Sequence, residues 1–430
     1  LFFYRNSPFK ALTTYLILSG VYSFATSTIF SINMVYQIEM VKLNPLQLVL
    51  VGTTLEVTCF LCQVPTGVIA DLYSRRLCVV IGYLLMGVGF LYEGLFAHFY
   101  PVLLAQVLWG FGITLVTGAQ EAWCADEIGE EHVGQAFLRG SQIGRIASLL
   151  SIPLSIGLAA TFQLNVPVIV GGGLLVMLGL FLLVYMPERH FVPAPPTGQS
   201  SWRTMGRVLI DGGKAVRRSR MLLAILGFSV FSAMASEGFD RLGIDHFIQD
   251  YKFPALGHLS SLVWFGVIGA GSSLLILPVT EMVRRKLDTN NQRVLVWLML
   301  AFNILLVGGI AVFALAGNFY LALAAYWIAS VFRGSLEPLY TIWLTRNSDP
   351  RMRATIISMF GQVDAVGQIA GGPGVGYIGT VTSIRAALLT TSAILAPTTL
   401  FLLRALHLSK QAPVYQAYDE EEQPLPMSIL

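Results

Sequence analysis

Residues 67–76 of this chain read Gly67-Val68-Ile69-Ala70-Asp71-Leu72-Tyr73-Ser74-Arg75-Arg76, and they join two long apolar runs, 46–70 and 77–97. Each run has the length of about 20 residues that an α-helix needs to cross the hydrocarbon core of a bilayer. Charged side chains are costly inside that core but stable at its surface. The segment is therefore predicted to be a turn at a membrane surface between two transmembrane helices.

The composition of all 430 residues supports a membrane location. Apolar residues make up 55% of the chain and charged residues only 12%, whereas soluble domains carry about 25% charged residues. Too few charges remain to cover a water-facing surface, so most of the surface is expected to face lipid. The apolar content also excludes a disordered chain, and 41 Gly and 19 Pro without a three-residue period exclude a collagen-like chain.

Twelve apolar runs are long enough to cross a membrane as helices. The predicted spans are residues 11–39, 46–70, 77–97, 101–124, 138–161, 165–186, 221–249, 258–282, 294–316, 318–345, 354–380 and 384–407. Unbroken runs of this length exclude the short alternating strands of a membrane β-barrel. The first run is expected to remain as a span, because it is too long for a signal peptide and a second span follows at once. We predict an all-α membrane protein with twelve transmembrane helices in two six-helix bundles.

The positions of the basic residues predict the orientation of these spans. If the N-terminus is cytoplasmic, most of the 27 Lys and Arg residues fall in cytoplasmic segments, and Lys42, Lys252 and Arg385 fall outside. Positive charge concentrates in cytoplasmic loops of membrane proteins. Both termini are therefore expected in the cytoplasm, and the protein is expected in the cytoplasmic (inner) cell membrane.

The longest connection follows the sixth predicted span and divides the chain. The predicted domains are an N-terminal bundle (1–186), a cytoplasmic linker (187–220), a C-terminal bundle (221–408) and a disordered cytoplasmic tail (409–430). The first part of the linker is Pro-rich, which is typical of a tether. Two interpretations of its basic second part remain open. It is either an amphipathic helix on the inner leaflet, where anionic lipids attract cations, or a solvated tether whose charge only sets the topology.

The segment quoted first also resembles a family signature. Its pattern is similar to G-x-x-x-D-x-x-G-R-R of the major facilitator superfamily, with Ser74 where the family usually has Gly. The resemblance implies secondary transport by alternating access, and a conformational latch that holds one state and breaks for the other. The latch residues would be Gly67, Asp71, Arg75 and Arg76. The alternative is that both arginines only set the topology. A degenerate second copy follows the eighth predicted span and contains Glu281, Arg284, Arg285 and Lys286.

A second resemblance concerns the eleventh predicted span. Residues 371–376 read Gly-Gly-Pro-Gly-Val-Gly and resemble a glycine–proline motif that the drug:proton antiporters of this superfamily carry in their fifth helix, where this chain has a degraded copy around Pro153. Gly and Pro together bend a helix and allow a partner to approach closely. The expected packing motif comprises Pro153, Gly371, Gly372, Pro373 and Gly376, with ordinary close packing as the alternative. An arginine that such antiporters usually carry in helix 4 is replaced by Gln106.

Ionisable residues inside the predicted spans are functional candidates, because charge is costly in a membrane. The candidates for proton coupling are Glu56, Glu237, Asp240, Arg241 and Asp364. Three of them, on the seventh span, share one helix face, where Arg241 can neutralise one of the two acids. An outer gate without a proton role is the alternative for these three. We expect the proton carrier to be Glu56, Asp240 or Asp364, with Arg241 tuning the acids beside it.

Two further expectations concern other charged residues of the predicted spans. Arg333 and Glu337 are four residues apart and are expected to form a membrane-embedded charge pair. Glu93 and Glu121 lie near helix ends and are expected to reach water.

Soluble-enzyme chemistry is not indicated by the sequence. The chain has no Walker loop, its six His are dispersed, and Cys59 and Cys62 have no second pair that would complete a metal site. We therefore expect no enzyme activity, no metal and no cofactor. The scattered basic residues also do not predict binding of nucleic acid.

The function expected from these patterns is secondary active transport, most specifically proton-coupled export of an amphiphilic, drug-like compound. Residues 118–123 and 236–241 resemble the tetracycline- and macrolide-efflux-like branch. The expected partners are a small-molecule substrate, protons and membrane lipids, and the protein is expected to be a monomer. Two alternatives remain open: a proton-coupled symporter or importer of a polar solute, and a lipid-handling or sensor protein without solute turnover.

Overall fold

The computed structural model describes residues 10–193, 201–255, 260–286, 291–350 and 352–409, and the regular secondary structure in these ranges is helical throughout. The first half contains α1 (Ala11–Phe30), α2 (Asn33–Val35), the π-helix η2 (Tyr36–Met40), α3 (Pro45–Leu72), α4 (Arg75–Leu95), α5 (Phe99–Val116), α6 (Ala119–Ile128), α7 (Glu130–Thr161) and α8 (Val166–Tyr185). The linker contains α9 (Ser201–Arg218). The second half contains α10 (Arg220–Asp250), α11 (Val263–Lys286), α12 (Gln292–Leu315), α13 (Phe319–Asn347), α14 (Arg353–Val381), α15 (Ile384–Leu395) and α16 (Pro397–Leu408).

Local sequence explains where many of these helices begin and end. Asn44 and Gln47 form a capping box at the start of α3, with Pro45 in the first turn. The side chain of Ser74 accepts a hydrogen bond from a backbone N–H of α4. Gly118, with a φ of 81°, separates α5 from α6, because this conformation is readily adopted only by glycine.

Eleven of the predicted spans coincide with helical segments that are long and apolar enough to cross a membrane, counted over the described residues. The remaining prediction, 354–380, coincides with α14, which has 29 residues but is not among the eleven. Its glycines and its polar side chains Gln362, Asp364 and Gln368 lower its hydropathy below that of the eleven. The chain is thus an all-helical, multi-pass membrane protein.

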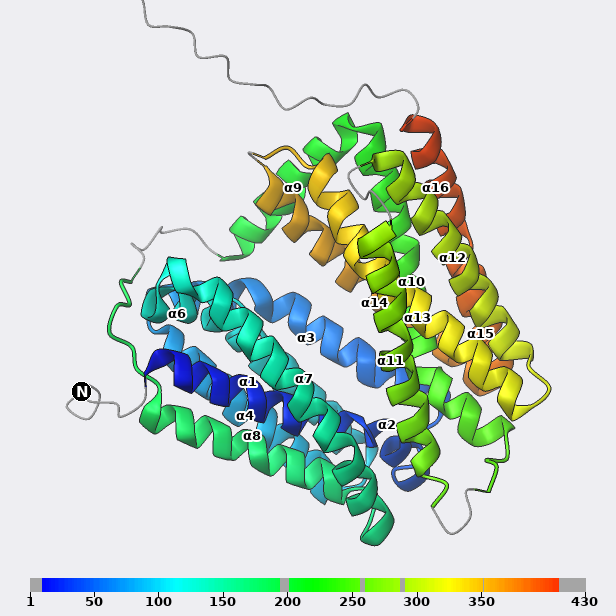
Figure 1. Cartoon of the computed structure of the whole chain (residues 1–430), viewed down its shortest axis with the longest axis horizontal. Helices are drawn as coiled ribbons and strands as arrows, with labels where there is room; N and C mark the ends of the chain where they lie inside the picture. Colours follow the sequence, from blue (N-terminus) through cyan, green and yellow to red (C-terminus); the bar gives the residue numbers. More distant parts are fainter. Residues whose placement is uncertain (1–9, 194–200, 256–259, 287–290, 351, 410–430) are drawn as a thin grey trace, which may run out of the picture.

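The helices form two bundles, each with its own hydrophobic core (Figure 1). One core is built from residues between 15 and 186, and the other mainly from residues between 216 and 406. Val35 and Val49 of the first bundle belong to the second core. The two bundles therefore share apolar packing where α2 and α3 meet the second half of the chain.

The bundles meet at one end of the molecule, which we call the closed end. There the backbone N–H of Leu46 donates to Thr380 Oγ1 at 2.9 Å, and the α3–α14 contact extends to a hydrogen bond from Gln362 Nε2 to Gln63 Oε1 at 3.2 Å. The bundles diverge toward α6 and α9 (Figure 1). We call that end, which carries Arg75 and the linker, the basic end.

The basic part of the linker is helical and packs on protein. Helix α9 contacts α14, α10 and α3. Val216 is buried, and Gly212 lies against Met359. A solvated tether is therefore wrong for residues 201–218. The predicted disordered tail lies outside the described residues, apart from Ser409.

Candidate functional site

The interface between the bundles holds an ion pair of α10 that rests against α3. Arg241 Nε lies 3.2 Å from Glu237 Oε2, and the two side chains are 17% and 6% exposed. Gly52 of α3 faces this pair, and a Cβ atom at that position would stand 2.7 Å from Arg241 Nε. Glycine is therefore required where the bundles cross, because a side chain would displace the pair.

The second acid of α10 pairs with an arginine of another helix. Arg333 of α13 donates to both carboxylate oxygens of Asp240, and the Nη2–Oδ2 distance is 2.6 Å. The expected pair between Arg333 and Glu337 is therefore wrong, because a facing helix offers Arg333 a bidentate carboxylate contact. Glu337 lines a cavity beside this pair. Glu237 and Asp240 thus each have their own arginine.

Glu56 and Asp364 differ from these acids, since neither makes an ion pair within the described part of the chain. Glu56 is half-buried on α3 and interacts electrostatically with Glu237, Asp364 and Arg241. Asp364 on α14 accepts a hydrogen bond from Gln368 Nε2 at 2.9 Å. The structure thus brings acids of α3, α10 and α14 together from both bundles and leaves two of them without a paired cation.

A cavity of about 730 Å³ lies beside these acids in the C-terminal bundle. Its lining includes the aromatic residues Phe228, Phe239, Tyr326, Tyr340 and Phe360 and the acids Glu337 and Asp364. The guanidinium of Arg333 stands 5.9 Å from the centre of the Phe239 ring. The aromatic rings suit the apolar body of a ligand, and the serine, threonine, carboxylate and arginine side chains of the lining suit its polar groups.

A second cavity of about 690 Å³ is lined by α1, α6, α7 and α11, and so includes both bundles. Its lining includes the polar residues Tyr15, Ser19, Tyr22, Ser23, Ser27, Gln120, Ser141, Arg145, Ser148 and Ser273. Arg145 is exposed there and makes no ion pair with any described residue. The charge of this cavity's lining is thus positive, whereas the first cavity is lined by Arg333 together with the acids Asp240, Glu337 and Asp364.

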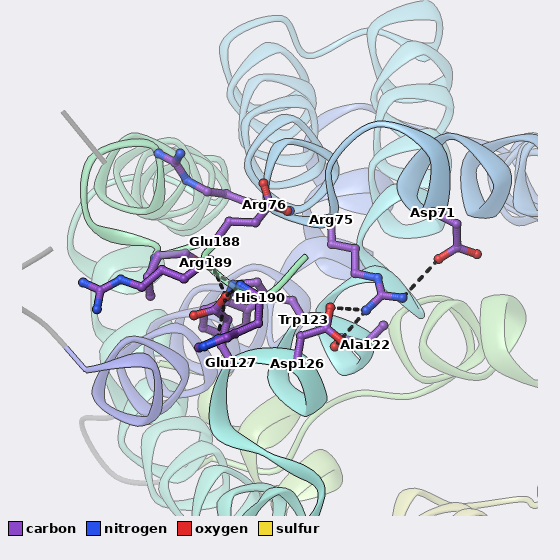
Figure 2. Close-up of polar contacts among 11 residues, drawn as sticks. Asp71, Arg75, Arg76, Ala122, Trp123, Asp126, Glu127, Glu188, Arg189 and His190 are labelled. Carbon is purple, nitrogen blue, oxygen red and sulfur yellow. Dashed lines mark hydrogen bonds and ion pairs between the residues drawn. The ribbon is translucent and has the colours of Figure 1, made fainter. Parts of the chain in front are cut away.

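The predicted latch residues lie at the basic end, and Arg75 is their centre (Figure 2). Arg75 forms an ion pair with Asp126 of α6 and donates to the carbonyl oxygen of Ala122 at 3.3 Å. Its contact with Asp71 is longer, 3.5 Å, and the Asp71 side chain is 57% exposed. Arg76 points away from Asp71 and donates to the carbonyl oxygen of Leu183 (Figure 2). All of these partners belong to the N-terminal bundle.

Gly67 makes no close helix contact in this conformation. It is exposed, and a Cβ atom there would have nothing within 4 Å. The expectation that Gly67 admits a neighbouring helix is therefore not met here, because the bundles have diverged at this end. In the second copy, Glu281 pairs with Arg284 at 2.7 Å and with Arg285, and the Lys286 side chain lies outside the described part.

Ser74, which departs from the family signature, joins the linker to the first bundle. Its Oγ donates to Glu188 Oε2 at 2.6 Å, and the backbone N–H of Arg76 donates to Glu188 Oε1 at 2.9 Å. Trp123 Nε1 also donates to the carbonyl oxygen of Pro187, at 2.6 Å. The start of the linker is thus fixed to the helices that carry the latch.

The glycine–proline motif of α14 packs against both bundles. A Cβ atom on Gly372 would stand 3.0 Å from Val49 Cγ1 of α3, and one on Gly376 would stand 3.1 Å from the Cα of Leu46. Gly371 instead faces the backbone of Met234 on α10. Pro153 is exposed within α7, and Gly157 nearby has nothing within 4 Å. Close packing is therefore observed for Gly371, Gly372 and Gly376 of α14 and not at Pro153.

Two helical bundles, acids at their interface and polar cavities are the features of a membrane transporter, and residues 16–361 match the family model described as Major Facilitator Superfamily. The chain belongs to the major facilitator superfamily. This confirms the family predicted from residues 67–76. The match covers more than half of the chain, and it leaves the branch within the superfamily open.

The proteins to which this chain is similar include transporters. The chain is 22% identical over 354 residues to an uncharacterized MFS-type transporter, YxaM, from Bacillus subtilis (strain 168), a match that covers 79% of this chain and 82% of that protein. The fold is similar to a crystal structure of the nucleoside transporter NupG, with a TM-score of 0.71, 14% identity, and coverage of 92% of this chain and 100% of that one. A bacterial homologue of the lysosomal transporter Spinster, in an inward-facing and unoccupied conformation, gives a TM-score of 0.72 at 13% identity, covering 93% and 97%.

Two residues with important contacts in this major facilitator protein differ from what the sequence analysis expected: Asp126 was not singled out, and Glu93 was expected to reach water. Asp126 is the partner of Arg75, and its position just after the fourth predicted span, at the basic end, was an available signal. Glu93 is fully buried and accepts a hydrogen bond from Gln37 Nε2 at 2.8 Å. The expectation that Glu93 reaches water is therefore wrong, because α1 and η2 cover this part of α4.

Replacing Gly372 with Val is expected to slow transport. The added methyl groups would meet Val49 and Thr53 of α3, and overpacking of this kind costs about 1–3 kcal/mol. The closed end would then seal less often, and we expect a loss of about fivefold or more in transport rate. Gly374→Val is the matched control, since nothing lies within 4 Å of a Cβ atom there. Equal transport by the two variants in proteoliposomes would contradict the role of this contact.

Proposed function

We propose that this chain is a proton-coupled exporter of amphiphilic, drug-like compounds that works by alternating access. In this proposal twelve helices span the membrane, both termini are cytoplasmic, and the protein acts as a monomer in a cell membrane. The observation that carries the proposal is the pair of acids, Glu56 and Asp364, that interact electrostatically across the bundle interface and form no ion pair with any described residue. Such acids can take up and release protons, whereas acids held by an arginine remain charged.

The first cavity supports an amphiphilic substrate. Asp364 is both a candidate proton carrier and part of the cavity wall, so protonation of Asp364 would change the charge that a substrate meets. Aromatic rings and carboxylates together favour a largely apolar molecule that carries positive charge. Competition between such a molecule and a proton for one carboxylate is a simple way to couple their movements in opposite directions.

The arrangement of the bundles supports alternating access. They are joined at the closed end and diverge at the basic end. If positive charge marks the cytoplasmic side, this conformation is open toward the cytoplasm. Rocking about the α3–α14 contact would then open the closed end to the outside.

A second candidate function, import of a polar solute, is favoured by the second cavity. Its serines and the unpaired Arg145 suit a solute with hydroxyls or negative charge. Import of a polar solute differs from the proposed export in both the substrate and the direction of transport.

Transport by purified protein in proteoliposomes tests the two candidates. A panel of cationic dyes and antibiotics is compared with sugars and organic anions, with and without an imposed pH gradient. We expect dyes or antibiotics to move against their gradient when protons move the opposite way. Movement of sugars or organic anions alone would favour the second candidate. A transport rate that is the same with and without the pH gradient would contradict proton coupling.

A further inference from the structure

A buried polar cluster surrounds Glu93 inside the N-terminal bundle, apart from the acids at the bundle interface. Glu93 lies on α4, Asn33 on α2, and Tyr36 and Gln37 on η2. Glu93 and Gln37 are 0% exposed, and Asn33 is 4% exposed. No step of the proposed transport mechanism uses this cluster.

Two consecutive residues of η2 hold Glu93 in place. Tyr36 donates through its hydroxyl to the backbone oxygen of Glu93 at 2.6 Å, and Gln37 Nε2 donates to Glu93 Oε1 at 2.8 Å. Consecutive side chains of a regular α-helix point in clearly different directions. The wider π-helical turn allows both to reach one residue, and such turns are frequent at functional sites.

The hydrogen bonds of the cluster leave acceptors in excess. Glu93 Oε2, Asn33 Oδ1 and Gln37 Oε1 are all buried and have no hydrogen-bond partner among the described residues. The Asn33 side chain also interacts with the Glu93 carboxyl. An ionised carboxylate only accepts hydrogen bonds, so it cannot satisfy any of these oxygens. A protonated carboxyl donates one hydrogen bond and can satisfy a neighbouring oxygen.

No paired cation balances a charge on Glu93. Among the described residues, the titratable or charged groups that interact with it are Tyr36 and Arg241. Arg241 belongs to the other bundle and is already paired with Glu237. A buried carboxylate without a contacting cation is strongly unfavourable, which leaves the neutral acid as the stable form.

We propose that Glu93, held by Tyr36 and Gln37, is a proton-binding site inside the N-terminal bundle, separate from Glu56 and Asp364. A sodium ion could also be bound by a carboxylate and amide oxygens. The proton is favoured here because Gln37 turns its NH₂ group toward Glu93, whereas a metal ion would require its oxygen. Because Arg241 approaches from the C-terminal bundle, the rocking of the bundles would change the electrostatic environment of this proton.

Infrared spectroscopy of the reconstituted full-length protein tests the site without any substrate, so a failure of the proposed transport function would not affect the result. The C=O stretch of a protonated carboxylic acid is compared between the wild type and Glu93→Gln in Na⁺-free medium. We expect the variant to lose one such band. Glu39→Gln is the matched control, because Glu39 lies on the same π-helix but is exposed and paired with Lys42 at 3.5 Å. It should keep the band.

Two results would overturn the proposal. Equal bands in the wild type and Glu93→Gln would mean that Glu93 is ionised, and loss of the wild-type band on adding Na⁺ at constant pH would identify a sodium site. If Glu93→Gln does not fold, Gln37→Leu provides the same information. This variant removes the donor to Oε1, so it should shift the wild-type band, and an unchanged band position would again assign the band to another acid.

Discussion

Replacing Glu56 with Gln or Asp364 with Asn is expected to reduce proton-driven accumulation of substrate to the level of protein-free liposomes in at least one case. The physical reason is that a neutral amide cannot exchange a proton, and these two acids have no ion pair within the described part of the chain. Counterflow of substrate down its own gradient should persist, because binding and rocking do not require the proton. Both assays are carried out on the same proteoliposome preparations.

Two other acids, one in the candidate site and one outside it, provide contrasts to these variants. Asp240→Asn would weaken the contact with Arg333 and is expected to reduce accumulation and counterflow together. Glu121→Gln alters an exposed carboxylate of α6 and should change neither. Full gradient-driven transport by both Glu56→Gln and Asp364→Asn would show that neither acid carries the proton.

We expect Asp71→Asn and Arg75→Ala each to reduce transport about tenfold. A tenfold loss corresponds to about 1.4 kcal/mol in the balance between conformations. The two variants are expected to differ in stability. Arg75→Ala leaves Asp126 without its cation and should cost about 1–3 kcal/mol of folding free energy. Asp71 is more than half exposed and its contact is long, so Asp71→Asn should cost about 0–1 kcal/mol. Thermal unfolding in detergent separates the two effects.

A matched control for the latch is Asp211→Asn on α9. Asp211 forms an exposed ion pair with Lys214 at 3.3 Å and belongs to no part of the signature. It should have normal transport and stability. If Asp71→Asn also transports normally, the signature segment only sets the topology, and the latch hypothesis fails.

Much of the fold could be predicted from local sequence. The apolar runs between 11 and 407 predicted helices at the observed places, and residues 67–76 predicted the superfamily. Such features depend on length, polarity and short-range spacing, which are properties of a single segment. Gly372 and Gly376 were likewise predicted to pack closely, since small residues in a membrane helix favour contact whatever the partner.

The ion-pair partners of the charged residues could not be predicted from local sequence. A helical spacing of four residues suggested that Arg333 would pair with Glu337, yet Arg333 pairs with Asp240 of α10. The choice depends on which faces of α10 and α13 meet, and no local pattern contains that information. In the same way, Arg75 was assigned to the signature segment, but Asp126 of α6 is its stronger partner.

The sequence by itself thus determined that this protein is a helical membrane protein of the major facilitator superfamily. The length of the apolar runs and the short signature at residues 67–76 are properties of single segments of the chain. The tertiary structure decided which acids are neutralised and which remain free. Glu237 and Asp240 each have an arginine, whereas Glu56 has none within the described residues. Glu93 is buried although it lies close to a helix end, because η2 covers it. Electrostatic pairing and burial depend on distances between helices, and these exist only after the two bundles have packed.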